Sequence, residues 1–222
     1  MLSHVENRTK SLYALWKPVI KDRTVVFVGD AAEIEHATVA LLAARGAPVF
    51  LAARSAAVLK QAFVDINKVG GECDGMVVDW SRPEEIRRFF MLAEAWLGGI
   101  DAVILPIAEG ADGDRASVER GHCWQEAIRR MQPAGRGHII NIHLPRENGT
   151  GNDSDQRITS ALRRQARELN IRVTLVEPPA SPDLPVEQYI AHCVLDSLSQ
   201  PYEPYVKEEK LHSGKRLSHS AQ

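Results

Sequence analysis

Short apolar runs alternate with longer segments of helical periodicity along most of the chain. Several runs are nearly continuous in valine, isoleucine, leucine and alanine, which is typical of parallel strands buried on both faces. They predict strands over 24–29 (TVVFVG), 48–53 (PVFLAA), 75–79 (GMVVD), 100–107 (IDAVILPI), 138–144 (HIINIHL) and 171–177 (IRVTLVE).

Each predicted strand is followed by a segment with helical spacing of apolar residues. Between Glu33 and Arg45, for example, Ile34, Ala37 and Leu41 fall on one face of a helix. The periodicity predicts helices over 33–45, 56–69, 83–97, 114–131, 153–169 and 185–198. Alternating strands and helices with right-handed crossovers predict the α/β class: a single doubly wound Rossmann-type three-layer sandwich, with a parallel sheet of at least six strands.

The pattern divides the chain into three parts. Residues 1–22 form an N-terminal extension, 23–200 the α/β domain, and 201–222 a polar C-terminal tail that ends in SGKRLSHSAQ. The first residues, MLSHVENRTK, lack the apolar core of a secretory signal. No apolar run approaches the roughly 20 residues of a membrane span. We therefore expect a cytoplasmic protein with no membrane association.

Composition narrows the function classes further. The 222 residues include 27 Lys and Arg against 29 Asp and Glu, a formal net charge of −2. This balance gives no general electrostatic reason to bind nucleic acid. The three cysteines, Cys73, Cys123 and Cys193, are too few and too widely spaced for a disulfide framework or a zinc site. We expect no metal.

Six segments between Arg23 and Gln200 resemble, in order, the short-chain dehydrogenases/reductases. The segments are VVFVGDAAEIEHATVALLAARGA, VFLAARS, VVDWSRPEEI, DAVILPIAEG, GHIINIHL and ALRRQARELNIRVTLVEPP. The resemblance implies a Rossmann fold, NAD(P)-dependent oxidation or reduction of alcohols and carbonyls, and assembly into dimers or tetramers. Because one fold carries many activities, each functional position needs to be checked in this chain.

The glycine-rich turn that the resemblance implies is largely replaced by acidic residues. The three positions at which the family has glycine are occupied here by Gly29, Glu33 and Glu35. Glycines there let the backbone approach a pyrophosphate at the helix N-terminus. One like-charge pair at about 5 Å costs about 3 kcal/mol at an effective dielectric near 20, against ~0.3–1 kcal/mol that the helix dipole offers an exposed anion. Alternatively, both glutamates simply favour the helix start. Either interpretation predicts a loop that holds phosphate poorly.

Other positions of the cofactor site are better preserved. The resemblance implies that Arg54, with Ser55 beside it, faces the 2′-phosphate of NADP, and that Asp79 contacts adenine. Each could equally be a solvated polar residue at a strand end. The family's NNAG motif appears as 105–108, LPIA, in which only Ala108 is retained. We therefore expect either no cofactor or weakly bound NADP.

The catalytic residues implied by the resemblance are missing. Two registers of the helix predicted over 153–169 place Asp155 and Thr159, or Gly151 and Asp155, where the family has tyrosine and lysine. In either register the pair is lost, because no tyrosine lies between 14 and 188 and no lysine between 68 and 207. Leu144 occupies the serine position, and no asparagine lies between 108 and 138. The segment 180–184, where the family builds a substrate-covering loop, is short.

A replacement site is conceivable at the carboxyl ends of the strands, where such folds bind ligands. Glu109 and His143 could form an acid/base pair there, with Asp155 nearby. The competing interpretation, which we favour, is a set of polar strand-end residues bonded to loop backbone.

Two surfaces are candidates for partners. Arginines gather on the helix predicted over 153–169 and before the strand predicted over 138–144: Arg157, Arg163, Arg164, Arg167, Arg129, Arg130 and Arg136. They could bind an acidic partner or a phosphorylated ligand, or they could form a solvated face paired with Glu168 and Glu126. The resemblance also implies a homodimer or homo-oligomer through the helices predicted over 114–131 and 153–169, using Ile158, Ala161, Leu162 and Leu169.

Three hypotheses follow for the function. The first is a pseudoenzyme: a Rossmann protein without the family's redox chemistry that acts in binding, in regulation or as a subunit. The second is a divergent NADP-dependent oxidoreductase that uses His143 or Asp155 for proton transfer. The third is a partner-binding module that works through its arginine-rich helix face.

Overall fold

A six-stranded parallel sheet forms the centre of the molecule in the computed structural model, which describes residues 20–29, 32–107, 113–143, 153–179, 182 and 184–200. The strand order is β3-β2-β1-β4-β5-β6, and every neighbouring pair is parallel. The strands are β1 (Val25–Val28), β2 (Val49–Ala53), β3 (Cys73–Val77), β4 (Ala102–Ile107), β5 (Gly137–His143) and β6 (Ile171–Val176). This architecture confirms the predicted Rossmann-type sandwich.

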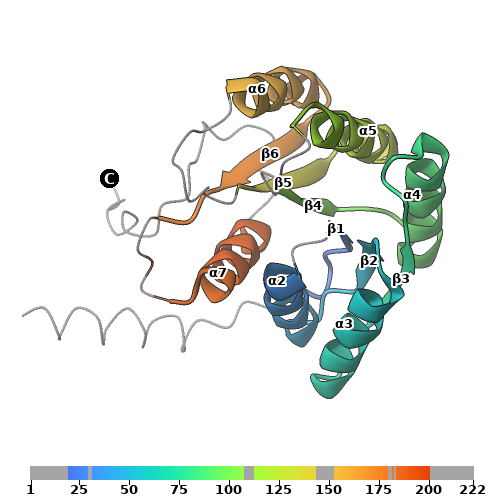
Figure 1. The fold of residues 1–222 in the computed structure, drawn as a ribbon, viewed down its shortest axis with the longest axis vertical. Helices are drawn as coiled ribbons and strands as arrows, with labels where there is room; N and C mark the ends of the chain where they lie inside the picture. The colour runs from blue at the N-terminus through green and yellow to red at the C-terminus, as the bar shows by residue number, and fades with distance from the viewer. Residues whose placement is uncertain are drawn as a thin grey trace, which may run out of the picture.

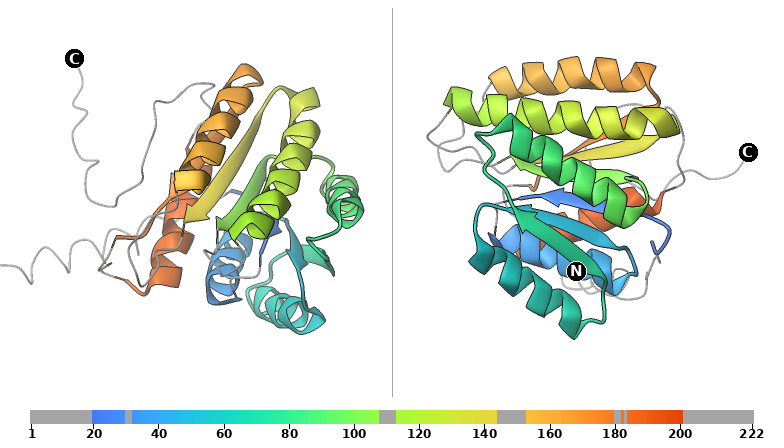
Figure 2. Two further views of the ribbon diagram at one scale, coloured as in Figure 1. Left: turned by 45° about the horizontal axis from the view of Figure 1, so that its top comes forward. Right: turned by 90° about the vertical axis from the view of Figure 1, so that its right-hand side faces the viewer.

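Helices cover both faces of the sheet (Figures 1 and 2). One face carries α2 (Ala32–Ala44), α3 (Ala56–Lys68) and α7 (Val186–Ser199), and the other carries α4 (Pro83–Leu97), α5 (Gly113–Met131) and α6 (Asp153–Glu168). A 3-10 turn, Gln132–Ala134, follows α5. Ser55 caps α3 through its hydroxyl, and α4 begins with Pro83 and ends at Gly98 in the left-handed conformation. Most element bounds agree with the sequence prediction to within one or two residues.

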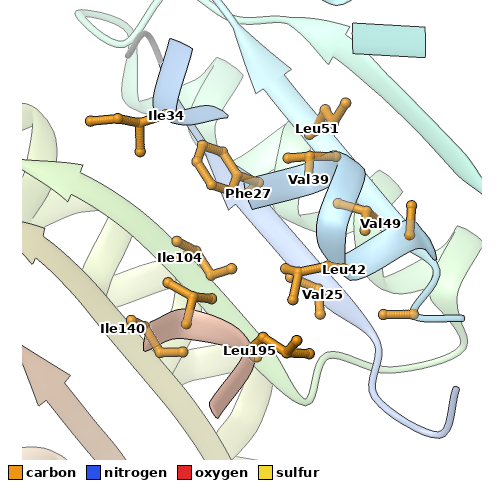
Figure 3. Close-up of a cluster of buried hydrophobic side chains, with 14 of the residues drawn as sticks. Val25, Phe27, Ile34, Val39, Leu42, Val49, Leu51, Ile104, Ile140 and Leu195 are labelled. Atoms are coloured by element: carbon orange, nitrogen blue, oxygen red, sulfur yellow. The ribbon is translucent and has the colours of Figure 1, made fainter. Parts of the chain in front are cut away.

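Two separate hydrophobic cores lie on the two faces. One joins β1, β2, β4 and β5 to α2, α3 and α7, and ten of its side chains are labelled in Figure 3. The other packs α4, α5 and α6 against the opposite side of the same strands. Val25 and Phe27 of β1 point into the first core and Val26 into the second, since successive side chains of a strand alternate between its faces. Hydrophobic side chains therefore cover both faces of the sheet.

The third strand lies two residues earlier than predicted. The apolar run suggested residues 75–79, whereas β3 pairs Cys73 with Val49 and Val77 with Ala53. As an edge strand, β3 is only partly buried, so its hydrophobic pattern is weak and the pairing to β2 sets its register. Gly75 fits there because a Cβ would lie 2.4 Å from the Leu51 carbonyl oxygen.

The predicted N-terminal extension and C-terminal tail lie, apart from residues 20–22, outside the described residues. Among the helices that the structure describes, none has the length and apolar character needed to cross a membrane.

Candidate functional site

The carboxyl edge of the sheet is the place where a doubly wound fold binds its ligand. β1 lies between β2 and β4, so the chain leaves β1 at the point where the strand order reverses. In doubly wound folds, ligands bind beside the carboxyl ends of the strands at such a point. Gly29 follows β1 at this edge, and Arg54 and Ser55 follow β2. The structure therefore brings these predicted cofactor residues to one edge of the sheet.

The space beside Gly29 is filled by the protein's own side chains. A Cβ on Gly29 would lie 2.6 Å from Phe27 Cε1 and 2.8 Å from Glu35 Oε2. Glu35 is 0% exposed, although it sits in the first turn of α2, and Glu33 of the same turn is exposed. The Glu35 side chain therefore turns inward, toward the end of β1. The position where a dinucleotide-binding loop has a small residue holds a buried carboxyl group instead.

Arg54 has a carboxylate neighbour within the protein. Its Nη2 donates to Oε2 of Glu119 on α5 at 3.1 Å. The Arg54 side chain is 60% exposed and that of Glu119 only 12%. This ion pair links the residue that follows β2 to α5. A phosphate that approached Arg54 would have to share the guanidinium with Glu119, because both compete for the same planar set of donors.

Ser55 and Asp79 both have structural roles. Ser55 Oγ accepts a hydrogen bond from the Ala57 backbone at 3.2 Å and so caps α3. Asp79 lies two residues beyond β3 and is exposed, and its Oδ1 accepts from Ser81 N at 3.0 Å and Ser81 Oγ at 2.6 Å. This arrangement is an Asx turn that leads into α4. The interpretation of both residues as polar groups at strand ends accounts for these contacts.

Two of the candidates for a replacement catalytic site have backbone positions at the carboxyl edge of the sheet. His143 is the last residue of β5, and Asp155 lies in the first turn of α6, the helix that follows β5. Both positions are therefore at the carboxyl edge of the sheet. Ala108 and Glu109 lie outside the described residues, so the predicted pairing of Glu109 with His143 stays a prediction.

The second core contains a polar pair that the sequence pattern did not predict. Trp124 of α5 donates from Nε1 to Oδ1 of Asn141 on β5 at 3.0 Å. Asn141 is 0% exposed and its Nδ2 has no hydrogen-bond partner. A buried amide that is only half satisfied lowers stability, so such a group is uncommon in a strand interior. The available signal was an asparagine within an otherwise apolar strand, IINIH.

The three cysteines are poor nucleophiles. All are free thiols. Burial raises the pKa of Cys123 to about 12 and that of Cys193 to about 11, and it also raises the pKa of Cys73. The thiolate is the reactive form of cysteine, so a raised pKa lowers the reactive fraction of each thiol at neutral pH. Within the described ranges, no group of histidine, cysteine and carboxylate side chains could hold a metal ion.

The arginine-rich face is partly neutralised by carboxylates. Glu126 of α5 pairs with Arg129 at 3.2 Å and with Arg87 of α4 at 3.6 Å, and Arg130 pairs with Glu94 at 2.7 Å. The predicted role of Glu126 is confirmed. The prediction for Glu168 is wrong, because within the described part of the chain it makes no ion pair.

Comparison with solved structures finds the same Rossmann-type fold in several short-chain dehydrogenases/reductases. The chain superimposes on a metagenomic short-chain oxidoreductase crystallised with NADP, with a TM-score of 0.70, 22% identity, and coverage of 88% of this chain and 98% of that one. A hydroxysteroid dehydrogenase from Escherichia coli gives a TM-score of 0.66, 21% identity, and coverage of 80% and 89%.

A citronellol catabolism dehydrogenase from Pseudomonas aeruginosa matches with a TM-score of 0.70, 18% identity, and coverage of 83% and 90% of the two chains. No family model matches the sequence, and no curated protein matches it either. The backbone architecture is therefore shared with these oxidoreductases, while the sequence identity to them is low.

Proposed function

We propose that this protein is a pseudoenzyme on the short-chain dehydrogenase/reductase fold, which acts in binding, in regulation or as a subunit and not in hydride transfer. The observation that carries the proposal is the buried Glu35 carboxyl group beside Gly29. It occupies space at the end of β1 and puts an acidic group where a pyrophosphate would need backbone N–H donors.

Two further features support the proposal. The Arg54–Glu119 ion pair sets a carboxylate against any 2′-phosphate. Helix α6 carries neither tyrosine nor lysine, so the usual proton donor and the cation that activates it are both lacking. Binding and catalysis are thus weakened at separate positions, which a single compensating change would not restore.

Calorimetric titration with NADPH tests this proposal. We expect the wild-type protein to bind NADPH with a dissociation constant above about 1 mM. The double variant Glu33→Gly/Glu35→Gly removes both carboxylates and opens the turn, so we expect it to bind at least about tenfold more tightly, a gain of about 1.4 kcal/mol.

The matched control is Glu187→Gly, which changes an acidic residue in the first turn of α7 and not in the turn that follows β1. It should bind NADPH no better than the wild type. Micromolar binding by the wild type with turnover of simple carbonyls would refute the proposal. A folded double variant that binds no better than the wild type would refute the account based on Glu35.

A divergent NADP-dependent oxidoreductase is the second candidate, favoured by the 60% exposed Arg54 side chain at the end of β2. On this hypothesis Arg54→Ala weakens NADPH binding at least about fivefold and leaves NADH binding unchanged, because only NADPH carries the 2′-phosphate. Titration of both cofactors into the wild type and the variant makes the comparison. Equal losses for both cofactors would count against this candidate.

A homodimer through α5 and α6 remains part of the proposal. Ala161 is exposed on α6, whereas Leu162 and Leu169 are partly buried and pack against the second core. A partner surface on α6 would therefore rely less on these two leucines than the sequence suggested.

A further inference from the structure

Helix α4, which lies at the outside of the molecule beside α5, has a second apolar stripe that faces away from the sheet (Figure 1). Three of its large apolar side chains are exposed: Met91 by 50%, Leu92 by 38% and Trp96 by 36%. No other helix within the described ranges exposes as many. A surface helix normally has one apolar stripe, and α4 already buries Ile86, Phe89, Phe90 and Ala93 in the second core.

The outer face of α4 also lacks the charges that usually face solvent. Residues 89–97, FFMLAEAWL, include one charged side chain, that of Glu94, and its Oε2 accepts from Arg130 of α5 at 2.7 Å. The exposed Ala95 lies one helical turn from Leu92 and beside Trp96. Residues 91, 92, 95 and 96 therefore form a continuous uncharged surface, here called the outer stripe. Such surfaces on soluble proteins often mark interaction sites.

The two ends of the outer stripe carry side chains suited to binding. Trp96 packs against Phe50, with ring centroids 5.8 Å apart and planes tilted by 49°, so its orientation is fixed before any partner arrives. Arg88, one turn before Met91 and Leu92, is exposed, and it makes no ion pair within the part of the chain that the structure describes. Tryptophan and arginine are enriched among the residues that contribute most to protein–protein binding.

The outer stripe is complementary to a second copy of itself that runs in the opposite direction. When the helix is reversed about the point midway between Leu92 and Ala95, these two positions exchange, and so do Met91 and Trp96. The large Leu92 of one copy then meets the small Ala95 of the other. The thioether of Met91 meets the ring of Trp96, which is a favourable contact. A two-fold symmetric interface requires this kind of self-complementarity.

The same register also satisfies Arg88. It sets Arg88 of one copy opposite Gly99 of the other, at the carboxyl end of the other copy's α4. The last carbonyl groups of a helix lack partners within the helix and carry the negative end of its dipole, so a guanidinium is stabilised there. Gly98 and Gly99 have no side chains to block the approach, and a Cβ at either would meet no atom within 4 Å.

From this shape and charge complementarity we propose that two copies of this protein associate through antiparallel α4 helices, with Leu92 of each copy against Ala95 of the other. The surface is distinct from the α5 and α6 faces and does not depend on the proposed function. Residues 88–99 span about 16 Å of helix, so the contact buries less than the ~800 Å² per partner of a standard interface. We therefore expect a weak dimer, with a dissociation constant of about 10–100 μM.

Sedimentation velocity at protein concentrations from about 5 to 500 μM tests the proposal, and the wild type should pass from monomer to dimer over this range. Met91→Glu would bury a carboxylate against Trp96 of the other copy, so we expect at least about tenfold weaker association. Its Tm in dilute solution should stay unchanged, because Met91 is exposed in the single copy. Arg88→Glu should weaken the dimer about fivefold. The matched control is Val64→Glu on α3, where Val64 is 42% exposed, and it should dimerise like the wild type.

Disulfide formation tests the antiparallel register. Mild oxidation of an equal mixture of Leu92→Cys and Ala95→Cys proteins should give at least about threefold more cross-linked dimer than either variant alone, because only the mixture brings the two thiols together. A wild type that stays monomeric at about 500 μM overturns the proposal. So does a dimer that Met91→Glu leaves intact, which would assign association to another face such as α5 and α6. Equal cross-linking in the mixture and in the single variants overturns the register.

Discussion

Acidification from pH 6.5 to pH 5 should destabilise this protein by about 2 kcal/mol through His138 alone. The imidazole is buried beside Arg172 and Arg23, which lowers its pKa to about 3 in the folded state. In the unfolded chain the histidine titrates near pH 6.5. Below pH 6.5 the unfolded state therefore binds a proton that the folded state does not, and stability falls by about 1.4 kcal/mol per pH unit until the folded pKa is reached.

Urea unfolding of the wild type and of His138→Gln at pH 7, 6.5, 6, 5.5 and 5 measures this effect. The variant keeps a hydrogen-bonding side chain toward Thr174 and does not titrate, so its free energy of unfolding should fall less steeply. His192, whose pKa is also lowered by burial and by Arg45, is present in both proteins and cancels from the difference. Parallel pH profiles for the two proteins would show that His138 gains a proton in the folded state.

Gly29→Ala should cost about 1–3 kcal/mol of stability, since the added methyl group would overlap the Phe27 ring and the Glu35 carboxyl group. Both neighbours belong to well-packed surroundings, so neither moves away at low cost. The control is Gly121→Ala within α5, where a Cβ meets no atom within 4 Å. That change should stabilise the protein by about 0.5–1 kcal/mol through helix propensity. Chemical denaturation of both variants makes the comparison.

A double-mutant cycle with Glu35→Ala then locates the carboxyl group directly. If Glu35 fills the space beside Gly29, Gly29→Ala should cost about 1 kcal/mol less when Glu35 is already alanine. Additive effects of the two substitutions would show that the Glu35 side chain lies elsewhere. They would remove the main support for the proposal that this protein is a pseudoenzyme.

The order of strands and helices could be predicted because parallel strands buried on both faces are nearly continuous in apolar residues. The prediction failed only at β3, whose pairing to β2 and not its own hydrophobicity sets the register. Gly29, Arg54 and Asp79 were correctly assigned to the region of the strand ends. Their partners, Glu35, Glu119 and Ser81, depend on rotamers and on contacts between distant segments, which no local pattern contains.

The groups that sequence reasoning missed share one property. His138 and Asn141 stand in β5 among isoleucines, and each resembles a single polar interruption of an apolar run. Their significance appears only when α7 brings Ser197 to His138 and α5 brings Trp124 to Asn141. Buried polar networks of this kind are built from tertiary neighbours.

The two cores share no residue, since the sheet itself lies between them. Energetic coupling between substitutions fades with distance and with the lack of common neighbours. Divergence of the layer that holds Phe27, Ile34 and α2 can therefore accumulate without disturbing the layer beneath α4, α5 and α6. In a scaffold divided in this way, substitutions in one layer leave the packing of the other layer intact.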